Sequence, residues 1–232
     1  MLYPPQCPCC AEGVAGDGAL CPACWSDMHF ITRSTCRGCA APLPDAGEVA
    51  RDALCDDCLI SPPAWDGARA ATIYDGSAKR MVLALKHGDR PDLGPLMGRW
   101  LAQALHGTDP GSVVIPIPLH PRRLLRRKYN QAELMSHMVA RSLGLAHEPL
   151  ALRRARNTLP QGHRSAEDRR QNMDRAFTVP RVAAQRLAGR PVLLIDDVMA
   201  SGATMSEATR TLRMAGLGPV TVAVLARAVK DN

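Results

Sequence analysis

Aromatic side chains are scarce in this chain of 232 residues, which contains three Trp, three Tyr and two Phe. Runs of about eighteen apolar residues are also lacking, so the sequence predicts no membrane insertion. The first residues have neither a basic start nor an apolar stretch, and we therefore expect no signal peptide and a cytoplasmic location. A hydrophobic content of 46% nevertheless predicts a folded core rather than long disorder.

Cysteine is absent after Cys58, since all nine cysteines lie between Cys7 and that residue. In a chain without a secretion signal, such clustering favours metal binding over disulfides. Eight of the nine form four Cys-x-x-Cys pairs, and Cys9 is expected to be a bystander. The four pairs are Cys7/Cys10, Cys21/Cys24, Cys36/Cys39 and Cys55/Cys58.

Two such pairs can complete one tetrahedral four-thiolate zinc site, so the eight cysteines predict two zinc ions. With all four positions filled by protein, both ions should be structural. Sequential pairing leaves spacers of ten and fifteen residues, and interleaved pairing stays open because spacing alone does not decide it. Redox or iron–sulfur use of the pairs is the competing interpretation.

Positive charge is concentrated in the middle of the chain. The whole protein carries +7, whereas residues 121–190 contain sixteen Lys/Arg against five Asp/Glu, a net charge of +11. Residues 1–58 are acidic, with three Arg against eight Asp/Glu. An anion-binding surface is therefore expected in the middle of the chain rather than on the cysteine segment.

The patterning divides the chain near Ser61-Pro62-Pro63, a stiff joint between residues 1–60 and residues 64–230. The second part alternates apolar strands with amphipathic helices, which predicts an α/β fold with a parallel sheet covered on both faces. Residues 155–175 are polar and indicate a long exposed loop or a loosely held helix. The expected strands are 68–74, 112–115, 191–195 and 220–225, and the expected helices are 77–87, 92–106, 130–143 and 205–214.

The segment from Val192 to Thr204 carries the strongest functional signal. An apolar run is followed by Asp196 and Asp197, whose carboxylates suit sugar hydroxyls or a magnesium ion. The next small residues let backbone amides close around a phosphate, and the following helix N-terminus adds donors. The simpler interpretation of each piece is a capped turn, but their combination predicts a site for a phosphorylated ribose. The residues of this expected phosphate loop are Ala200, Ser201, Gly202, Ala203 and Thr204.

This segment resembles the signature of type I phosphoribosyltransferases, and the chain as a whole resembles the competence-associated ComF/GntX family. The resemblance extends from the cysteine pairs through 85–90, 116–123, 130–131 and 192–204. It implies a double zinc ribbon followed by a phosphoribosyltransferase domain that binds phosphoribosyl diphosphate with Mg²⁺. It also implies that Asp196 and Asp197 hold the ribose diol.

The same resemblance assigns the diphosphate to the loop after the 112–115 strand and a flexible flap to residues 153–170. Ala200 departs from the family pattern, in which Thr is common, so one hydroxyl is lost from the phosphate loop. The residues expected to contact the diphosphate, the flap or DNA are Lys86, Leu119, His120, Arg122, Arg123, Arg126, Arg127, Arg153 and Arg164.

The dense basic stretch has three explanations: a solvated face, a set of diphosphate ligands, or a track for nucleic acid. With Tyr129 as the one aromatic residue in the cluster at 122–129, backbone tracking is more plausible than base stacking. Two functions therefore remain. One is a phosphoribosyltransferase with an unidentified acceptor, and the other is a non-catalytic single-stranded DNA-handling protein of natural transformation that contacts other competence proteins.

Overall fold

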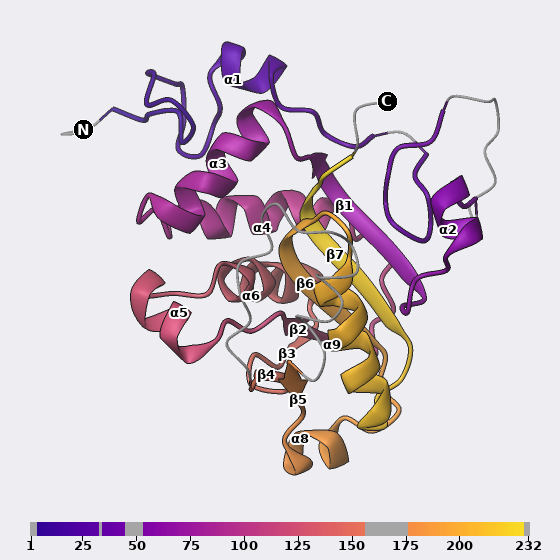
Figure 1. Ribbon diagram of the computed structural model, residues 1–232. Helices are drawn as coiled ribbons and strands as arrows, with labels where there is room; N and C mark the ends of the chain where they lie inside the picture. Colours follow the sequence, from indigo (N-terminus) through magenta and orange to yellow (C-terminus); the bar gives the residue numbers. More distant parts are fainter. Residues whose placement is uncertain (1–3, 33, 45–52, 156–175, 230–232) are drawn as a thin grey trace.

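The computed structural model describes residues 4–32, 34–44, 53–155 and 176–229, and a parallel five-stranded sheet lies at its centre (Figure 1). The strand order is β1-β7-β6-β2-β3, so β6 is central. The α/β parallel sheet expected from the alternating pattern is confirmed. The strands are β1 (Gly67–Ile73), β2 (Val113–Pro116), β3 (Ala146–His147), β6 (Val192–Met199) and β7 (Val220–Arg227).

Apolar side chains alternate between two cores along each central strand. In β6, Val192 and Leu194 face one core, whereas Leu193 and Ile195 face the other. One face is covered by α3 (Gly76–His87), α4 (Leu93–Gln103) and α6 (Gln131–Leu143). The opposite face is covered by α8 (Arg181–Arg186), α9 (Ala203–Met214) and the hairpin of β4 (Arg153–Arg154) with β5 (Phe177–Thr178).

Local sequence signals explain the helix boundaries. Asn130 caps α6 by accepting a hydrogen bond from the Ala132 amide at 3.2 Å, and Gly144 ends the helix with a φ of +67°. Gly98 of α4 allows α6 to approach closely, because a Cβ at this position would lie 2.8 Å from the Met135 carbonyl oxygen. The two helices therefore form a tightly packed pair on one face of the sheet.

The cysteine-rich segment contributes two short helices, α1 (Pro22–Ser26) and α2 (Asp56–Ile60). Between them, Phe30 forms an antiparallel bridge with Thr72 of the edge strand β1. Hydrogen bonds from the Ile31 amide to the Ala71 carbonyl and from the Ile73 amide to the His29 carbonyl, both 2.9 Å, flank this bridge. The segment therefore covers one edge of the sheet.

Three details differ from the sequence-based expectations. The strand expected to end at Ile195 continues through both aspartates to Met199, because β7 pairs with it along this length. The helix expected over 92–106 is shorter, and the loop expected around Leu119 to Arg123 contains a helix, α5 (Pro121–Arg127). The polar segment 156–175 lies outside the described residues. Within the described ranges, the structure contains no helix that is long and apolar enough to cross a membrane.

Candidate functional site

The eight paired cysteines form two clusters, and within each cluster one sulfur atom per residue lies within 4.8 Å of the others. The first cluster joins Cys7, Cys10, Cys21 and Cys24, and the second joins Cys36, Cys39, Cys55 and Cys58. Sequential pairing is thus the arrangement found, and the interleaved alternative is excluded. Four converging thiols with no fifth protein ligand in either described cluster fit a tetrahedral zinc ion.

The thiols within each cluster differ in how easily they ionise, because neighbouring thiolates repel one another. Burial opposes ionisation of Cys7, but the backbone amides of Cys21, Cys10 and Cys9 outweigh it and lower the pKa of Cys7 to about 6. In the second cluster the amides of Cys55 and Cys39 likewise overcome burial and lower the pKa of Cys36 to about 7. Burial raises the pKa of Cys58 far above its ordinary value. A divalent cation would relieve this crowding, which fits both clusters as metal sites.

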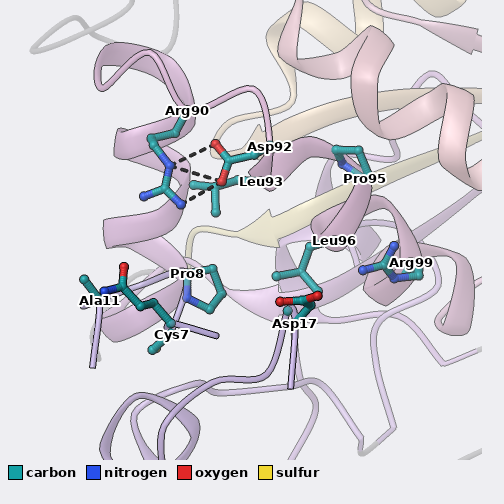
Figure 2. A pocket seen from close by; sticks show the side chains of 12 residues that line it. Cys7, Pro8, Ala11, Asp17, Arg90, Asp92, Leu93, Pro95, Leu96 and Arg99 are labelled. Carbon is teal, nitrogen blue, oxygen red and sulfur yellow. Dashed lines mark hydrogen bonds and ion pairs between the residues drawn. The ribbon is translucent and has the colours of Figure 1, made fainter. Parts of the chain in front are cut away.

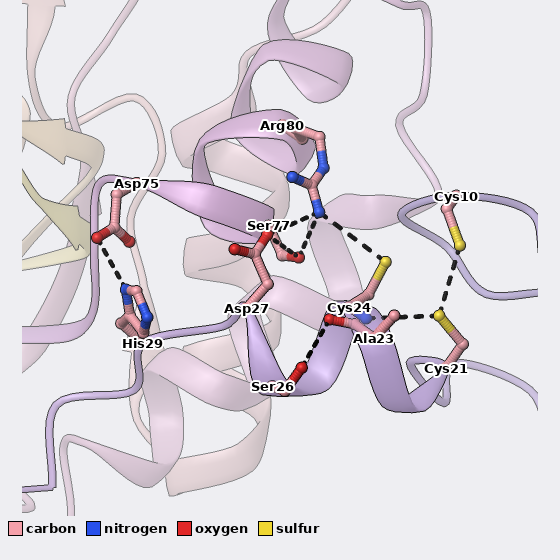
Figure 3. Close-up of polar contacts among 10 residues, drawn as sticks. All are labelled: Cys10, Cys21, Ala23, Cys24, Ser26, Asp27, His29, Asp75, Ser77 and Arg80. Carbon is pink, nitrogen blue, oxygen red and sulfur yellow. Dashed lines mark hydrogen bonds and ion pairs between the residues drawn. The ribbon is translucent and has the colours of Figure 1, made fainter.

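The first cluster docks on α3 through Asp27, whose carbonyl accepts a hydrogen bond from the Ser77 amide at 3.2 Å and whose side chain makes further contacts (Figure 3). Asp27 accepts a hydrogen bond from the Ser77 hydroxyl at 3.1 Å and pairs with Arg80 at 2.8 Å. Arg80 also lies 4.0 Å from the Cys24 sulfur. Both partners of the ion pair are about half exposed, so this attachment is accessible to water.

The second cluster docks through its backbone. Residues 36–39, the turn between its first two cysteines, are called the knuckle below. Three consecutive carbonyl oxygens of this knuckle accept hydrogen bonds from the rest of the protein. The Arg37 carbonyl binds the Ala68 amide at 2.8 Å, and the Gly38 carbonyl binds the Trp65 indole at 2.7 Å. The Cys39 carbonyl accepts from the Arg227 guanidinium at 2.8 Å.

Two adjacent carboxylates lie near the end of the central strand β6. Asp197 is 7% exposed and forms an ion pair with Lys86 of α3 at 2.8 Å. Asp196 accepts a hydrogen bond from the Asp197 amide at 2.9 Å. Burial and then the negative charge of Asp197 raise the pKa of Asp196 to about 7. This desolvated acid pair fits hydroxyl donors of a sugar or a magnesium ion.

Positive side chains surround the acid pair. Arg154 of β4 interacts electrostatically with both Asp196 and Arg123, and burial lowers its pKa to about 10. The pKa of His87 is lowered by burial and then by Arg127, Lys86 and Arg126, which places these charges in the same neighbourhood. The acid pair therefore lies among cations that suit a polyanionic ligand.

The segment expected to bind phosphate links β6 to α9. Ala200 and Ser201 are exposed, and Gly202 adopts a φ of +73° immediately before the helix. A Cβ at Gly202 would lie 2.6 Å from the Trp65 ring, so only glycine fits here. Ala203 and Thr204 begin α9, whose twelve residues direct their first backbone amides toward this segment.

The loop after β2 approaches the acid pair from the neighbouring strand. Leu119 and His120 are partly exposed, and the His120 ring accepts a hydrogen bond from the Arg122 amide at 3.3 Å to cap α5. The side-chain Nδ2 of Asn130 donates a hydrogen bond to the Ile117 carbonyl at 3.0 Å, which anchors the start of the loop. In an open parallel sheet, ligands bind beyond the carboxyl ends of adjacent strands, where this loop and the acids meet.

The remaining basic residues differ in their exposure to solvent. Arg122 and Arg126 are exposed on α5, whereas Arg123 and Arg127 are partly buried. Arg153 is exposed, and its neighbour Arg154 is the one that interacts with Asp196. The predicted residue Arg164 lies outside the described residues.

Sequence reasoning missed Trp65 and Arg227, which contact the segment expected to bind phosphate. Arg227 donates to the Met199 carbonyl at 2.9 Å and to the Ala200 carbonyl at 2.8 Å. Neither residue belongs to a local motif. The one available signal was the position of Arg227 just after the expected strand 220–225, where a charged side chain reaches the carboxyl end of the sheet.

A cavity of about 440 Å³ lies elsewhere, between the first cysteine cluster and the start of α4 (Figure 2). Arg90 and Asp92 pair across its rim at 2.7 Å, and Arg99 and Asp17 also line it. None of the residues expected to bind phosphate or the ribose diol lines this cavity. It is therefore separate from the candidate ligand site.

Comparison with known proteins gives two kinds of match. Residues 1–59 match the double zinc ribbon domain, and residues 140–231 match the phosphoribosyl transferase domain. Competence protein F of Haemophilus influenzae is 29% identical, over 90% of this chain and 96% of its own length. DNA utilization protein YhgH of Salmonella typhimurium is 28% identical, over 95% of this chain and 89% of its own length.

Among solved structures, the allosteric regulatory enzyme of purine biosynthesis matches 60% of this chain at 23% identity, with a TM-score of 0.38. The match spans about a quarter of the enzyme's own length, 25%.

The cysteine clusters and the parallel sheet together define a double zinc ribbon followed by a phosphoribosyltransferase domain. The chain is homologous over nearly its whole length to competence protein F and DNA utilization protein YhgH, as the resemblance predicted.

Proposed function

We propose that the protein binds phosphoribosyl diphosphate with Mg²⁺ at the carboxyl ends of β6 and β2. The observation that carries this proposal is the desolvated acid pair of Asp196 and Asp197, followed directly by the Gly202 turn and the N-terminus of α9. In this arrangement the acids bind the ribose diol and the metal. The segment 200–204 binds the 5-phosphate through its amides and the Ser201 and Thr204 hydroxyls.

The cations around the pair complete the proposed site. Lys86 forms an ion pair with Asp197 at 2.8 Å. On binding, its ammonium group would turn to the diphosphate, while Arg123 and Arg154 supply further positive charge. Such preorganised cations would stabilise a diphosphate leaving group if transfer to an acceptor occurs. We propose ligand binding as the function, with phosphoribosyl transfer to an unidentified acceptor as its catalytic extension.

The test is isothermal titration of the zinc-loaded protein with phosphoribosyl diphosphate, with and without Mg²⁺. Binding should require Mg²⁺ and should weaken by about a hundredfold in Asp197→Asn, because a buried charged partner is lost. Asp92→Asn is the matched control, since it removes an exposed carboxylate of the same size. The proposal is wrong if the wild type shows no binding, or if both variants bind equally well.

A second candidate function, binding of single-stranded DNA, is favoured by α5. All seven residues of this helix are at least partly exposed, and four of them are arginines. Leu125 is 82% exposed between them. The name DNA utilization protein belongs to relatives that align over 95% or more of this chain, which supports the same proposal.

Salt dependence tests this second candidate. The logarithm of the affinity for single-stranded DNA should fall linearly with the logarithm of salt concentration, and each lost phosphate contact should reduce the slope by about 0.7. Arg122→Gln with Arg126→Gln should reduce the slope by about twice that amount. Arg181→Gln with Arg210→Gln removes the same charge from exposed sites on α8 and α9 and should leave the slope nearly unchanged. Equal slopes in the two double variants would contradict a role for α5.

A further inference from the structure

The second cysteine cluster and the candidate phosphate loop share the same binding partners. Arg227, at the end of β7, donates through Nε to the Cys39 carbonyl at 2.8 Å. The same guanidinium donates through one terminal nitrogen to the carbonyls of Met199, Ala200 and Ala228. One side chain thus joins the cysteine knuckle to the start of the loop.

Trp65 makes a second connection between the same two parts. Its indole nitrogen donates to the Gly38 carbonyl at 2.7 Å, and its ring packs where a Cβ of Gly202 would lie at 2.6 Å. Ala40, which follows the knuckle, is fully buried in the same core cluster as Trp65 and Met199. The position of the knuckle therefore determines where the indole and the guanidinium lie.

The knuckle itself is narrowly constrained. A Cβ at Gly38 would lie 2.9 Å from the Cys58 sulfur, and the Cys55 amide points at the Cys36 sulfur at 3.3 Å. A metal ion held by the four thiolates fixes this backbone and turns the carbonyls of residues 37–39 outward. Without the ion, repulsion between thiolates would open the knuckle and displace the carbonyls.

The first cluster has no such connection within the described residues. Its polar contacts with α3 run from the carboxylate and carbonyl of Asp27 to Ser77 and Arg80, and Met28 packs into the core on that face of the sheet. Among the described residues, neither Arg227 nor Trp65 forms a hydrogen bond with this cluster. The two clusters therefore provide an internal comparison.

We propose that the metal in the second cluster positions the phosphate loop, with Arg227 and Trp65 as the positioning residues. Loss of metal there releases residues 199–202 and weakens binding of the phosphate group, whereas loss at the first cluster does not. The ligand consequence depends on the proposed function, but the coupling itself can be measured without any ligand.

Hydrogen exchange of the amides of residues 199–204 in the zinc-loaded, ligand-free protein measures the coupling. Arg227→Met should raise their exchange at least about tenfold, because several charge-assisted hydrogen bonds are lost together. Arg190→Met is the matched control, since Arg190 binds the carbonyls of Gly111 and Ser112 at the opposite end of the sheet. Arg227→Lys should give an intermediate exchange rate, because one ammonium cannot bridge the Cys39 carbonyl and the loop.

The metal is tested by Cys39→Ser against Cys10→Ser, which occupy the same position in the two clusters. Each should lose one zinc ion, but only Cys39→Ser should raise loop exchange and weaken binding of phosphoribosyl diphosphate with Mg²⁺ by about tenfold. If Cys39→Ser does not fold, Trp65→Phe replaces it, because this variant removes both the hydrogen bond to Gly38 and the outer indole ring that packs against Gly202.

Equal loop exchange in Cys39→Ser and Cys10→Ser would overturn the proposal. So would an unchanged loop in both Arg227→Met and Trp65→Phe. If the wild type binds no phosphoribosyl diphosphate, the proposed function fails, and the exchange experiment still decides the coupling.

Discussion

The two cysteine clusters have the same ligand set but are attached to the sheet domain in different ways. The first is joined to α3 mainly through one residue, Asp27, whose carboxylate contacts the half-exposed Arg80 and whose carbonyl accepts one hydrogen bond from the Ser77 amide. The second uses backbone carbonyls of residues 37–39 to contact buried or partly buried groups around β1 and β7. Docking mainly through one residue tolerates small movements, whereas three backbone carbonyls in a row transmit any change in the knuckle. Identical metal motifs can therefore differ in what they control.

Removal of both metal ions should have the largest effect. Structural zinc contributes roughly 10 kcal/mol or more to the folding of small cysteine modules, so a chelator should unfold residues 1–60 while β6 and β7 stay protected. Hydrogen exchange should then rise at residues 199–204 and remain low in the later turns of α3, whose amides bond within the helix. Similar increases at both places would break the comparison between the clusters.

The second-largest effect is expected from overpacking the turn between Cys36 and Cys39 of the second cluster. Gly38→Ala places a methyl group 2.9 Å from the Cys58 sulfur and should lower the free energy of unfolding by roughly 1–3 kcal/mol. Gly13→Ala is the control in the first ribbon, because a Cβ there meets nothing within 4 Å. Thermal melts of both zinc-loaded variants would measure the difference, and equal melting points would contradict the tight packing.

The response to pH should differ between the acid pair of Asp196 and Asp197 and the exposed ion pair of Asp27 and Arg80. The pKa of Asp196 is raised to about 7 by burial and by Asp197, so the folded protein holds this proton between about pH 4 and pH 7. Its contribution to stability is therefore present at low pH and is lost as pH rises toward 7. Conversely, Mg²⁺-dependent ligand binding needs the ionised form and should strengthen by up to about tenfold per pH unit below pH 7.

Titration at several pH values would test this expectation, with Asp196→Asn as the control for protons released by the ligand phosphates. The exposed pair should not respond in this range, because the Ser77 hydrogen bond and then Arg80 lower the pKa of Asp27. A pH dependence that is identical in wild type and Asp196→Asn would show that the carboxylate does not titrate on binding.

The smallest effect is expected from the docking of the first cluster. Asp27→Asn removes the charge that Arg80 contacts, and a half-exposed ion pair is strongly screened. We expect a fall in melting temperature of about 2 °C or less and no change at residues 199–204. A larger loss of loop protection would mean that the first cluster also positions the ligand site.

The sequence predicted the α/β architecture well because it depends on local patterns, whereas the role of the acid pair stays a prediction. Apolar runs and helix caps such as Asn130 specify elements within a few residues. By contrast, spacing left the pairing of the cysteines open, since either arrangement closes a tetrahedral site. Sequential pairing became clear only when the sulfur positions were known.

Contacts between distant segments were beyond the reach of local patterns. Arg227 meets Cys39 across 188 residues of sequence, and Trp65 meets Gly38 across 27. The extension of β6 through Asp196 and Asp197 likewise depends on pairing with β7, because aspartates ordinarily end a strand. The helix α5 was missed because its arginines suggested a loop and its apolar residues are not buried.

The bridge between Phe30 and Thr72 also affects the solubility of the protein. β1 is an outer strand of the sheet, and the segment around Phe30 occupies the hydrogen-bonding groups that such a strand would otherwise offer. Open strand edges readily recruit strands from other molecules. A shortened protein that begins at residue 64 would therefore self-associate through β1, so the cysteine-rich segment protects the fold against aggregation.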